Sequence, residues 1–156
     1  MFKLAELGLP DGFIRWTRNF LADRTSTVIV GSASSFAIPI ETGVLQGPVL
    51  GPLLFSLYIN DIPKEKTTNL SFSLLFADDL VTAFRQNKDG RIESQVNAYL
   101  LRVEAWLRRW RLAISPNKCF FIVFCRGQPF KGYKLKLYGE PIPYNAHPRF
   151  LGESIR

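Results

Sequence analysis

The chain has 156 residues, of which 47% are hydrophobic and 13 are phenylalanine, so it can bury the core of one domain and is not an intrinsically disordered protein. Its formal net charge is +7, from 20 lysine and arginine residues against 13 acidic residues, which favours a polyanionic partner, most often nucleic acid. No apolar run is long enough to span a membrane, and the first residues do not form a signal peptide.

Two helices are predicted at the start of the chain. Residues 2–8 are typical of the end of a helix, with Gly8 as its stop. A second helix begins at Pro10, and an apolar stripe marks the side that we expect to be buried. The stripe consists of Phe13, Ile14, Thr17, Phe20 and Leu21.

Two strands and a further helix follow. Residues 25–30 are rich in β-branched side chains, and residues 36–40 are predicted to pair back with them after a turn. Residues 41–52 form a loop rich in glycine and proline. Leucines at helical spacing from Leu50 onward predict an amphipathic helix. We expect Asp61 just beyond its last turn, because a carboxylate is unfavourable at a helix C-terminus.

The segment Ser71–Phe84 is predicted to be a β-hairpin with at least one buried face, because apolar and small residues alternate along its first arm. Asp78 and Asp79 lie at its tip. A solvated turn is one interpretation, since aspartate favours turns. The other is a metal site, because a divalent cation relieves the repulsion between adjacent carboxylates and Mg²⁺ prefers oxygen ligands. The pair alone does not decide between them.

The longest helix is predicted over about residues 89–111, with most of its arginines solvated and one or two able to touch phosphate. Residues 115–117 then turn into a strand at residues 119–124, and a second short strand follows at residues 134–138.

The two cysteines, Cys119 and Cys125, stand at the first residue of the strand predicted over residues 119–124 and directly after its last. They would share a face of it but stand too far apart to bond to each other. No histidine or cysteine cluster accompanies them, so we expect free buried thiols in a reducing compartment rather than a zinc site. The intracellular location, nucleus or cytoplasm, is left open.

Several stretches, in order, resemble reverse transcriptases, most closely those of non-LTR (LINE-like) retrotransposons. The family's loop-and-helix segment resembles TGVLQGPVLGPLLFSLYINDIP, and its active-site hairpin resembles SLLFADDL, with Phe in place of the usual Tyr. Its next segment resembles WRLAISPNKCFFIVF, and the start of its primer-grip hairpin resembles RFLG. The helix and strands before the loop, LGLPDGFIRWTRNFLADRTSTVIVG, also match, so the resemblance covers nearly the whole chain.

The resemblance implies an RNA-directed DNA polymerase of α+β fold: part of the palm of a right-hand polymerase, in which an antiparallel sheet is backed by two or three helices. It implies two-metal nucleotidyl transfer with Mg²⁺. The implied partners are an RNA template, a DNA primer and deoxynucleoside triphosphates, with no membrane involved. The oligomeric state is left open.

The resemblance also assigns residues of the active site. Asp78 matches a metal-binding carboxylate, and Asp79 supports it. Phe76 would lie beside the primer terminus or the incoming nucleotide, with the hairpin core as its alternative place. Lys118 matches a lysine that assists pyrophosphate departure, with an ordinary surface lysine as the alternative.

Two further groups are assigned in the same way. Gln46 and Gly47 would lie against the template base and the nucleotide, because a backbone without a side chain can approach a ligand closely; an ordinary loop is the alternative. Phe150, Leu151 and Gly152 would begin the primer grip. The sequence departs from the family pattern nearby: Leu45 replaces a usual proline, Pro48 a usual serine and Ser115 a common asparagine.

Residues 1–156 are accordingly interpreted as a partial reverse transcriptase domain. The strand with the family's other essential aspartate and the fingers would precede the first helix, and the thumb would follow Arg156. With two of three carboxylates, this chain alone cannot complete a two-metal site, so we predict no catalytic turnover for it. Two alternatives are a non-catalytic nucleic-acid-binding remnant and a decayed fragment with an aggregation-prone sheet edge.

Overall fold

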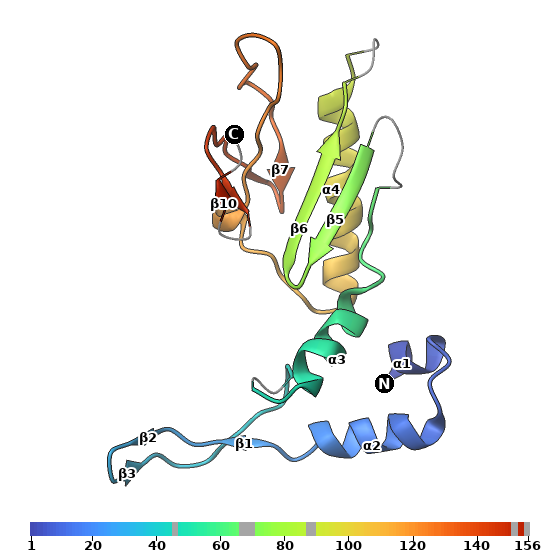
Figure 1. The fold of residues 1–156 in the computed structure, drawn as a ribbon, viewed down its shortest axis with the longest axis vertical. Coiled ribbons are helices and arrows are strands. Elements are labelled where there is room, and N and C mark those ends of the chain that lie inside the picture. Colours follow the sequence, from blue (N-terminus) through green and yellow to red (C-terminus); the bar gives the residue numbers. More distant parts are fainter. Residues whose placement is uncertain (45–46, 66–70, 87–89, 151–152, 155–156) are drawn as a thin grey trace. The chain divides into compact units, whose positions relative to one another are not determined.

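The computed structural model describes residues 1–44, 47–65, 71–86, 90–150 and 153–154, and the side chains of residues before 150. The chain divides into two compact units, Met1–Asp61 and Ile62–Arg156 (Figure 1). The described residues form four α-helices and short antiparallel ladders, which confirms the α+β class. The ladders are separate two-stranded pairs instead of one continuous sheet. None of the helices in these ranges is long and apolar enough to cross a membrane.

Three helices form the body of the first unit: α1 (Phe2–Glu6), α2 (Asp11–Leu21) and α3 (Leu50–Ile59). The predicted apolar stripe of α2 is confirmed, since its five members are the residues of that helix that are shielded from solvent. Thr17 is fully buried, and its hydroxyl donates to the Phe13 carbonyl at 2.9 Å. The buried Lys3 joins α1 to the end of α3 through the Tyr58 carbonyl and the Asp61 carboxylate.

The helix predicted from Leu50 is confirmed as α3, and Asp61 lies beyond its last turn as expected. The prediction that it is amphipathic is wrong, because Ser56 is the one residue of α3 that is strongly polar and apolar side chains occupy nearly every side. Leu54 and Ile59 are buried, whereas Leu53 on the opposite side is 53% exposed.

The predicted strand pair of the first unit is confirmed as a long arm (Figure 1). Its outgoing side contains β1 (Thr25–Ser26) and β2 (Ile29–Val30), and its return side contains β3 (Ala33–Ser34) and β4 (Ile38–Pro39). The turn at its tip is shorter than expected and consists of residues 31 and 32, with Gly31 at φ +61°, as a type II′ hairpin turn requires.

A β-bulge divides the arm. Ser26 pairs with Ile38 at the base, but Ile29 pairs with Ser34 toward the tip, so the return side carries one residue more than the outgoing side. Because the Ser35 N–H still donates to the Val28 carbonyl at 2.9 Å, the extra residue falls at residues 36–37. Phe36 is 94% exposed there.

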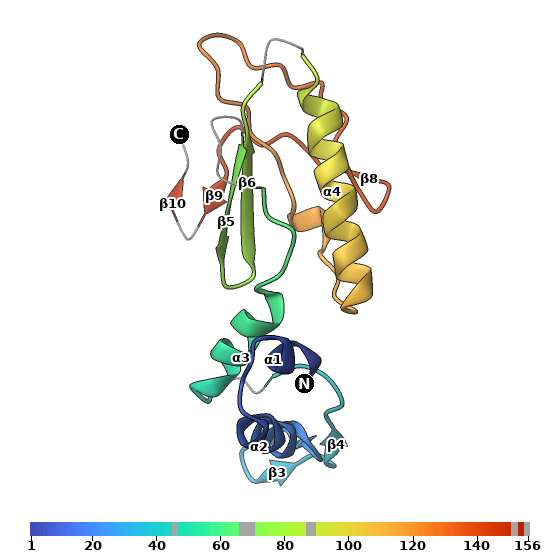
Figure 2. The same ribbon diagram turned by 90° about the vertical axis from the view of Figure 1, so that its right-hand side faces the viewer.

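The second unit is built around a hairpin of β5 (Ser71–Phe76) and β6 (Asp79–Phe84), one face of which lies against α4 (Ile92–Arg109) (Figure 2). The hairpin and its two unlike faces are confirmed, but the apolar residues that alternate along the first arm lie on the exposed face. Phe72, Leu74 and Phe76 are 40%, 54% and 61% exposed. The side turned toward α4 carries the two serines and Leu75 of β5, because polar groups make the connection to the helix there.

That connection is a chain of hydroxyl hydrogen bonds. Ser73 Oγ and Thr82 Oγ1 lie 3.0 Å apart across the hairpin, and Thr82 Oγ1 donates to Tyr99 Oη of α4 at 2.9 Å. Tyr99 in turn donates to the Pro63 carbonyl at 3.1 Å, and the Glu65 N–H donates to Ser73 Oγ at 2.8 Å. Each hydroxyl thus has a donor and an acceptor role, which fixes the hairpin on the helix.

The second hairpin of this unit consists of β7 (Lys136–Leu137) and β8 (Glu140–Pro141), and the buried cluster of Leu135, Leu137 and Ile142 lies within and directly beside it. Side chains of α4 form hydrogen bonds with the backbone of residues 134 and 136, along the edge of β7. Glu93 accepts the Lys134 N–H at 3.1 Å, and Asn97 accepts the Lys136 N–H while donating to the Lys134 carbonyl. The strand predicted over residues 134–138 is confirmed in shortened form.

The strand predicted over residues 119–124 is wrong. After the 3₁₀ turn η1 (Pro116–Lys118), this segment makes a single parallel bridge, between Phe121 and Tyr144. Toward residue 119 the ladder stops because Pro143 has no N–H to donate, and toward residue 124 the His147 N–H donates to Asn145 Oδ1 instead. The described end of the chain forms β9 (Arg149–Phe150) and β10 (Glu153–Ser154).

Both cysteines are free, as expected. The expectation that they are buried is wrong for Cys125, which is exposed, whereas Cys119 is half-buried.

Candidate active site

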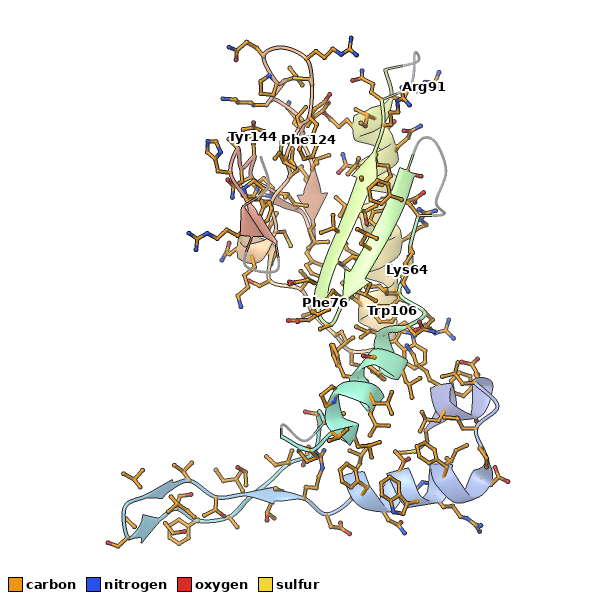
Figure 3. All side chains as sticks on the ribbon, viewed as in Figure 1. Lys64, Phe76, Arg91, Trp106, Phe124 and Tyr144 are labelled. Carbon is orange, nitrogen blue, oxygen red and sulfur yellow. The ribbon has the colours of Figure 1, made fainter. Side chains whose placement is uncertain are left out.

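The aspartate pair lies where the chain reverses between β5 and β6. Phe76 pairs with Asp79, which leaves Ala77 and Asp78 as a two-residue turn. Asp79 is therefore the first residue of β6, and Asp78 precedes it within the turn. Both carboxylates are exposed, and Phe76 lies beside them at the end of the hairpin (Figure 3). The tip thus presents two acidic side chains to solvent next to an exposed aromatic ring.

The turn holds a residue in an unfavourable conformation. Ala77 has φ +48°, the left-handed region that glycine adopts freely and that alanine avoids because of its Cβ. A tight hairpin turn needs positive φ at its first central position, so the chain accepts this strain to place Asp78. Strain of this kind, at a cost of about 1–3 kcal/mol, tends to occur at functional sites.

The hairpin is held firmly behind its tip. The hydrogen bonds from Ser73 through Thr82 to Tyr99 anchor the middle of both strands to α4. The Phe84 ring packs edge-on against the Tyr99 ring, with 5.6 Å between centroids. The carboxylates therefore project from a support whose strands are fixed by hydrogen bonding and packing.

The residues at the tip fit a hard divalent cation. Carboxylate oxygens are the ligands that Mg²⁺ prefers, and Mg²⁺ commonly takes one or two carboxylates and completes its coordination with water and substrate phosphates. Asp78 and Asp79 supply two such groups with their oxygens open to solvent. Within the described residues, no group of three or more histidine, cysteine, aspartate or glutamate side chains is assembled.

The other predicted site residues occupy separate places. Gly47 lies before α3 in the first unit, at φ +103°, and an added Cβ would meet no atom within 4 Å, so its backbone conformation is what requires glycine. Lys118 is exposed at the end of η1, and no ion pair joins it to a carboxylate in the described part of the chain. Phe76 is exposed, which rules out the alternative that it fills the hairpin core.

Part of the predicted site cannot be compared with the structure. Leu45 and Gln46 of the loop, and Leu151 and Gly152 of the proposed primer grip, lie outside the described residues. The backbone of Phe150 lies in β9 and pairs with Glu153 of β10. The structure thus brings together Phe76, Asp78 and Asp79 at one tip.

The sequence analysis missed the residues that support this tip. Ala77 carries the strain, and Ser73 and Thr82 link the hairpin to Tyr99. A signal for the serine–threonine pair was present, because a two-residue turn places residues 73 and 82 directly opposite each other. The left-handed conformation of an alanine has no such signal in the sequence.

Comparison with known proteins identifies the family. The profile of the family "Reverse transcriptase (RNA-dependent DNA polymerase)" matches residues 1–154. The chain is 31% identical, over 92% of its length, to the "Probable RNA-directed DNA polymerase from transposon X-element" of Drosophila melanogaster, of which it covers 16%. It is 30% identical, over 99% of its length, to the "RNA-directed DNA polymerase from mobile element jockey" of the same species, of which it covers 17%.

The chain therefore spans about a sixth of the length of these curated relatives. No solved structure matches it significantly. The family profile covers both the hairpin with its two aspartates and the loop that contains Gly47. The resemblance inferred from the sequence motifs is confirmed: the chain belongs to the reverse transcriptase family, as part of a reverse transcriptase domain of the non-LTR retrotransposon type.

Proposed function

We propose that this chain supplies the metal-binding hairpin of an RNA-directed DNA polymerase, within the palm of a right-hand fold. The observation that carries the proposal is the exposed Asp78–Asp79 pair on a strained turn whose strands are anchored to α4. In a member of the reverse transcriptase family, that arrangement suits Mg²⁺ and a nucleotide substrate. An RNA template and a DNA primer are the proposed partners.

The residues divide the work of nucleotidyl transfer. Asp78 and Asp79 hold the divalent cations, which when bound stabilise the charge on the attacking and leaving oxygens. Phe76, exposed beside them, packs against the primer terminus or the incoming nucleotide. Lys118, an exposed ammonium group, donates a proton to the departing pyrophosphate. Gln46 and Gly47 contact the template base and the nucleotide, and Phe150, Leu151 and Gly152 begin the primer grip.

We assign residues 1–156 to the palm and expect no turnover from this chain alone. A two-metal site in this family needs a further carboxylate, and no third acidic residue accompanies Asp78 and Asp79 in the motif. Catalysis by the full domain therefore draws on segments beyond this one. Metal binding at the hairpin tip, in contrast, requires only residues that the chain contains.

The experiment measures Mn²⁺ binding to the 156-residue chain by electron paramagnetic resonance, since Mn²⁺ substitutes for Mg²⁺ at oxygen sites. We expect binding that is lost in Asp78→Asn and weakened in Asp79→Asn. Asp23→Asn is the matched control, because Asp23 is an exposed aspartate at φ +49°, a conformation that asparagine tolerates. Equal binding by the wild-type chain and Asp78→Asn would overturn the metal assignment. Primer extension by the wild-type chain that vanishes in Asp78→Ala would overturn the expected lack of turnover.

A further inference from the structure

The positive charge of the chain is concentrated in one of its two units. Residues 62–156 contain 16 lysine and arginine residues against 8 acidic residues, whereas residues 1–61 contain 4 against 5. The second unit thus has a formal charge of +8 and the first a formal charge of −1, which together give the +7 of the chain. A surface that attracts a polyanion is therefore to be sought in the second unit.

In this unit, the C-terminal cap of α4 contains an unusual residue, Arg111. The Leu112 N–H donates to the Leu107 carbonyl at 2.9 Å, and the Arg111 N–H donates to the Arg108 carbonyl at 3.3 Å. This pair of bonds defines a Schellman motif, in which the residue at the position of Arg111 is usually glycine because it adopts the left-handed conformation. Arg111 has φ +53°. The chain thus keeps an arginine where glycine would be less strained.

The arginines in the second half of α4 and just after its end fall into two groups. Arg102 pairs with the Glu65 carboxylate, and Arg108 lies 3.7 Å from the Glu104 carboxylate, so their charges are partly neutralised. Arg109 and Arg111 are both exposed, and neither forms an ion pair in the described ranges of the chain. The Arg109 guanidinium lies over the Trp110 ring, 5.6 Å from its centroid, which restricts where that charge is presented.

These two arginines lie at the same end of the second unit as the aspartate tip. The bond from Thr82 to Tyr99 fixes α4 beside β6, and β6 leads away from the tip while α4 returns toward it. Figures 1 and 2 both show the end of α4 and the turn of the hairpin at one end of the unit. The two arginines therefore add positive charge at the end of the unit that carries the carboxylates.

We propose that Arg109 and Arg111 form a contact for the phosphate backbone of nucleic acid. Favourable interaction with the helix dipole accounts for a cation at Arg109. The helix dipole does not account for Arg111, because an arginine in this backbone conformation lowers stability and a glycine would cap the helix equally well. That the anion is a nucleic acid rests on the proposed function; the charge and the geometry define a contact for phosphate groups.

The experiment measures binding of a fluorescent RNA–DNA hybrid to the 156-residue chain by anisotropy, over a series of salt concentrations, beside the thermal unfolding midpoint of each variant. We expect Arg111→Gly to raise Tm by about 2–4 °C, because it relieves the strained backbone. The same variant should reduce the slope of log K against log salt by about 1, since one phosphate contact is lost. The double variant Arg109→Gln/Arg111→Gln should reduce the slope by about 2 and weaken binding at least about tenfold.

Two controls separate this contact from general charge effects. Arg102→Gln removes a cation from the same helix that Glu65 already neutralises, so it should change the slope by much less. Arg109→Lys/Arg111→Lys should keep the slope. An equal effect of Arg102→Gln, an unchanged slope in the double variant, or a lower Tm in Arg111→Gly would overturn the proposal.

The outcome is distinguishable from that of the proposed function. Mn²⁺ binding at Asp78 is measured on the same Arg109→Gln/Arg111→Gln protein, and we expect it to be intact. Absence of hybrid binding by a wild-type chain that still binds Mn²⁺ would overturn the arginine contact and leave the metal site standing.

Discussion

The Glu104 carboxylate, carried on the buried side of α4, accepts the backbone N–H of Tyr138 at 2.6 Å. Glu93 and Asn97 accept the N–H groups of Lys134 and Lys136 in the same way, so α4 side chains accept alternate N–H groups from residue 134 to residue 138. A helix thus replaces a neighbouring strand along this edge, which leaves fewer backbone groups available for pairing with another chain.

Glu104→Ala is expected to destabilise the second unit by about 1–3 kcal/mol, because it leaves the Tyr138 N–H without an acceptor in a part-buried position. Glu104→Gln keeps a carbonyl oxygen at the same place and should cost less. Arg108→Gln removes only the exposed side of an ion pair and should cost less than about 1 kcal/mol. Urea unfolding measures all three. Equal losses in Glu104→Gln and Glu104→Ala would contradict the role of the oxygen.

Ala77→Gly is expected to stabilise the hairpin by about 1 kcal/mol, because glycine adopts the positive φ of this turn without strain. The freer turn should also weaken Mn²⁺ binding by Asp78 and Asp79. Ala83→Gly in β6 is the matched control and should destabilise by about 0.5–1 kcal/mol, since Ala83 has an ordinary strand conformation. Unfolding and metal titration of both variants give the comparison, and a loss of stability in Ala77→Gly would refute the strain.

Thr82→Val preserves the shape of the side chain and removes the hydroxyl that links Ser73 to Tyr99. We expect a loss of about 1–2 kcal/mol, because hydroxyl groups on both sides lose a partner. A double-mutant cycle with Tyr99→Phe should show a coupling energy above about 0.5 kcal/mol, as expected for residues that share one hydrogen bond. Strictly additive effects of the two substitutions would show that the chain does not act as a unit.

Gly47→Ala is expected to destabilise the first unit by about 1–2 kcal/mol, although the added methyl group has free space, because φ is +103° there. Gly12→Ala in α2 is the matched control. Its surroundings are equally open but its φ is ordinary, so alanine should raise stability by about 0.5–1 kcal/mol. Chemical unfolding distinguishes the two signs, and a stabilising Gly47→Ala would disprove the conformational requirement.

The two thiols are expected to differ in reactivity. Burial raises the pKa of the Cys119 thiol, so less of it is thiolate at a given pH, whereas Cys125 is exposed. Iodoacetamide at pH 8 should therefore alkylate Cys125 first, which mass spectrometry of the digested protein can follow over time. The variant Cys125→Ser should react slowly throughout. Faster labelling of Cys119 than of Cys125 would contradict the effect of burial.

Helical periodicity predicted the helices well, because a buried stripe such as that of α2 is local in sequence. The choice of face in the β5–β6 hairpin was not predictable in this way. Alternation shows that a strand has two different faces, but here Ser73 faces the helix and Leu74 faces solvent. The face that turns toward α4 is the one whose hydroxyl groups hydrogen-bond to Tyr99. Tyr99 is 26 residues away from Ser73 in the sequence, so the local pattern does not reveal this partner.

The candidate site likewise has a part that the sequence predicts and a part that it does not. Asp78 and Asp79 were predictable because their chemistry is contained in a short motif. The unpredictable part lies in backbone conformation, since nothing in the letters Arg-Trp-Arg indicates that Arg111 is left-handed. Likewise, the strand expected at residues 119–124 does not form because its neighbour offers no free donor on either side of Phe121, having a proline at 143 and a His147 N–H that bonds to Asn145, and this is seen only once the two segments lie together.

The bulge at residues 36–37 has a consequence for the arm as an apolar surface. Ile29, Val30 and Phe36 are exposed, and a flat strand edge with such residues would attract a second chain in register. The extra residue shifts the pairing on its two sides by one position, so neither ladder extends beyond two residue pairs. An incoming strand would lose its alignment at the same point. The arm therefore exposes apolar side chains, but its backbone does not offer the long, regular edge on which fibrils grow by strand pairing.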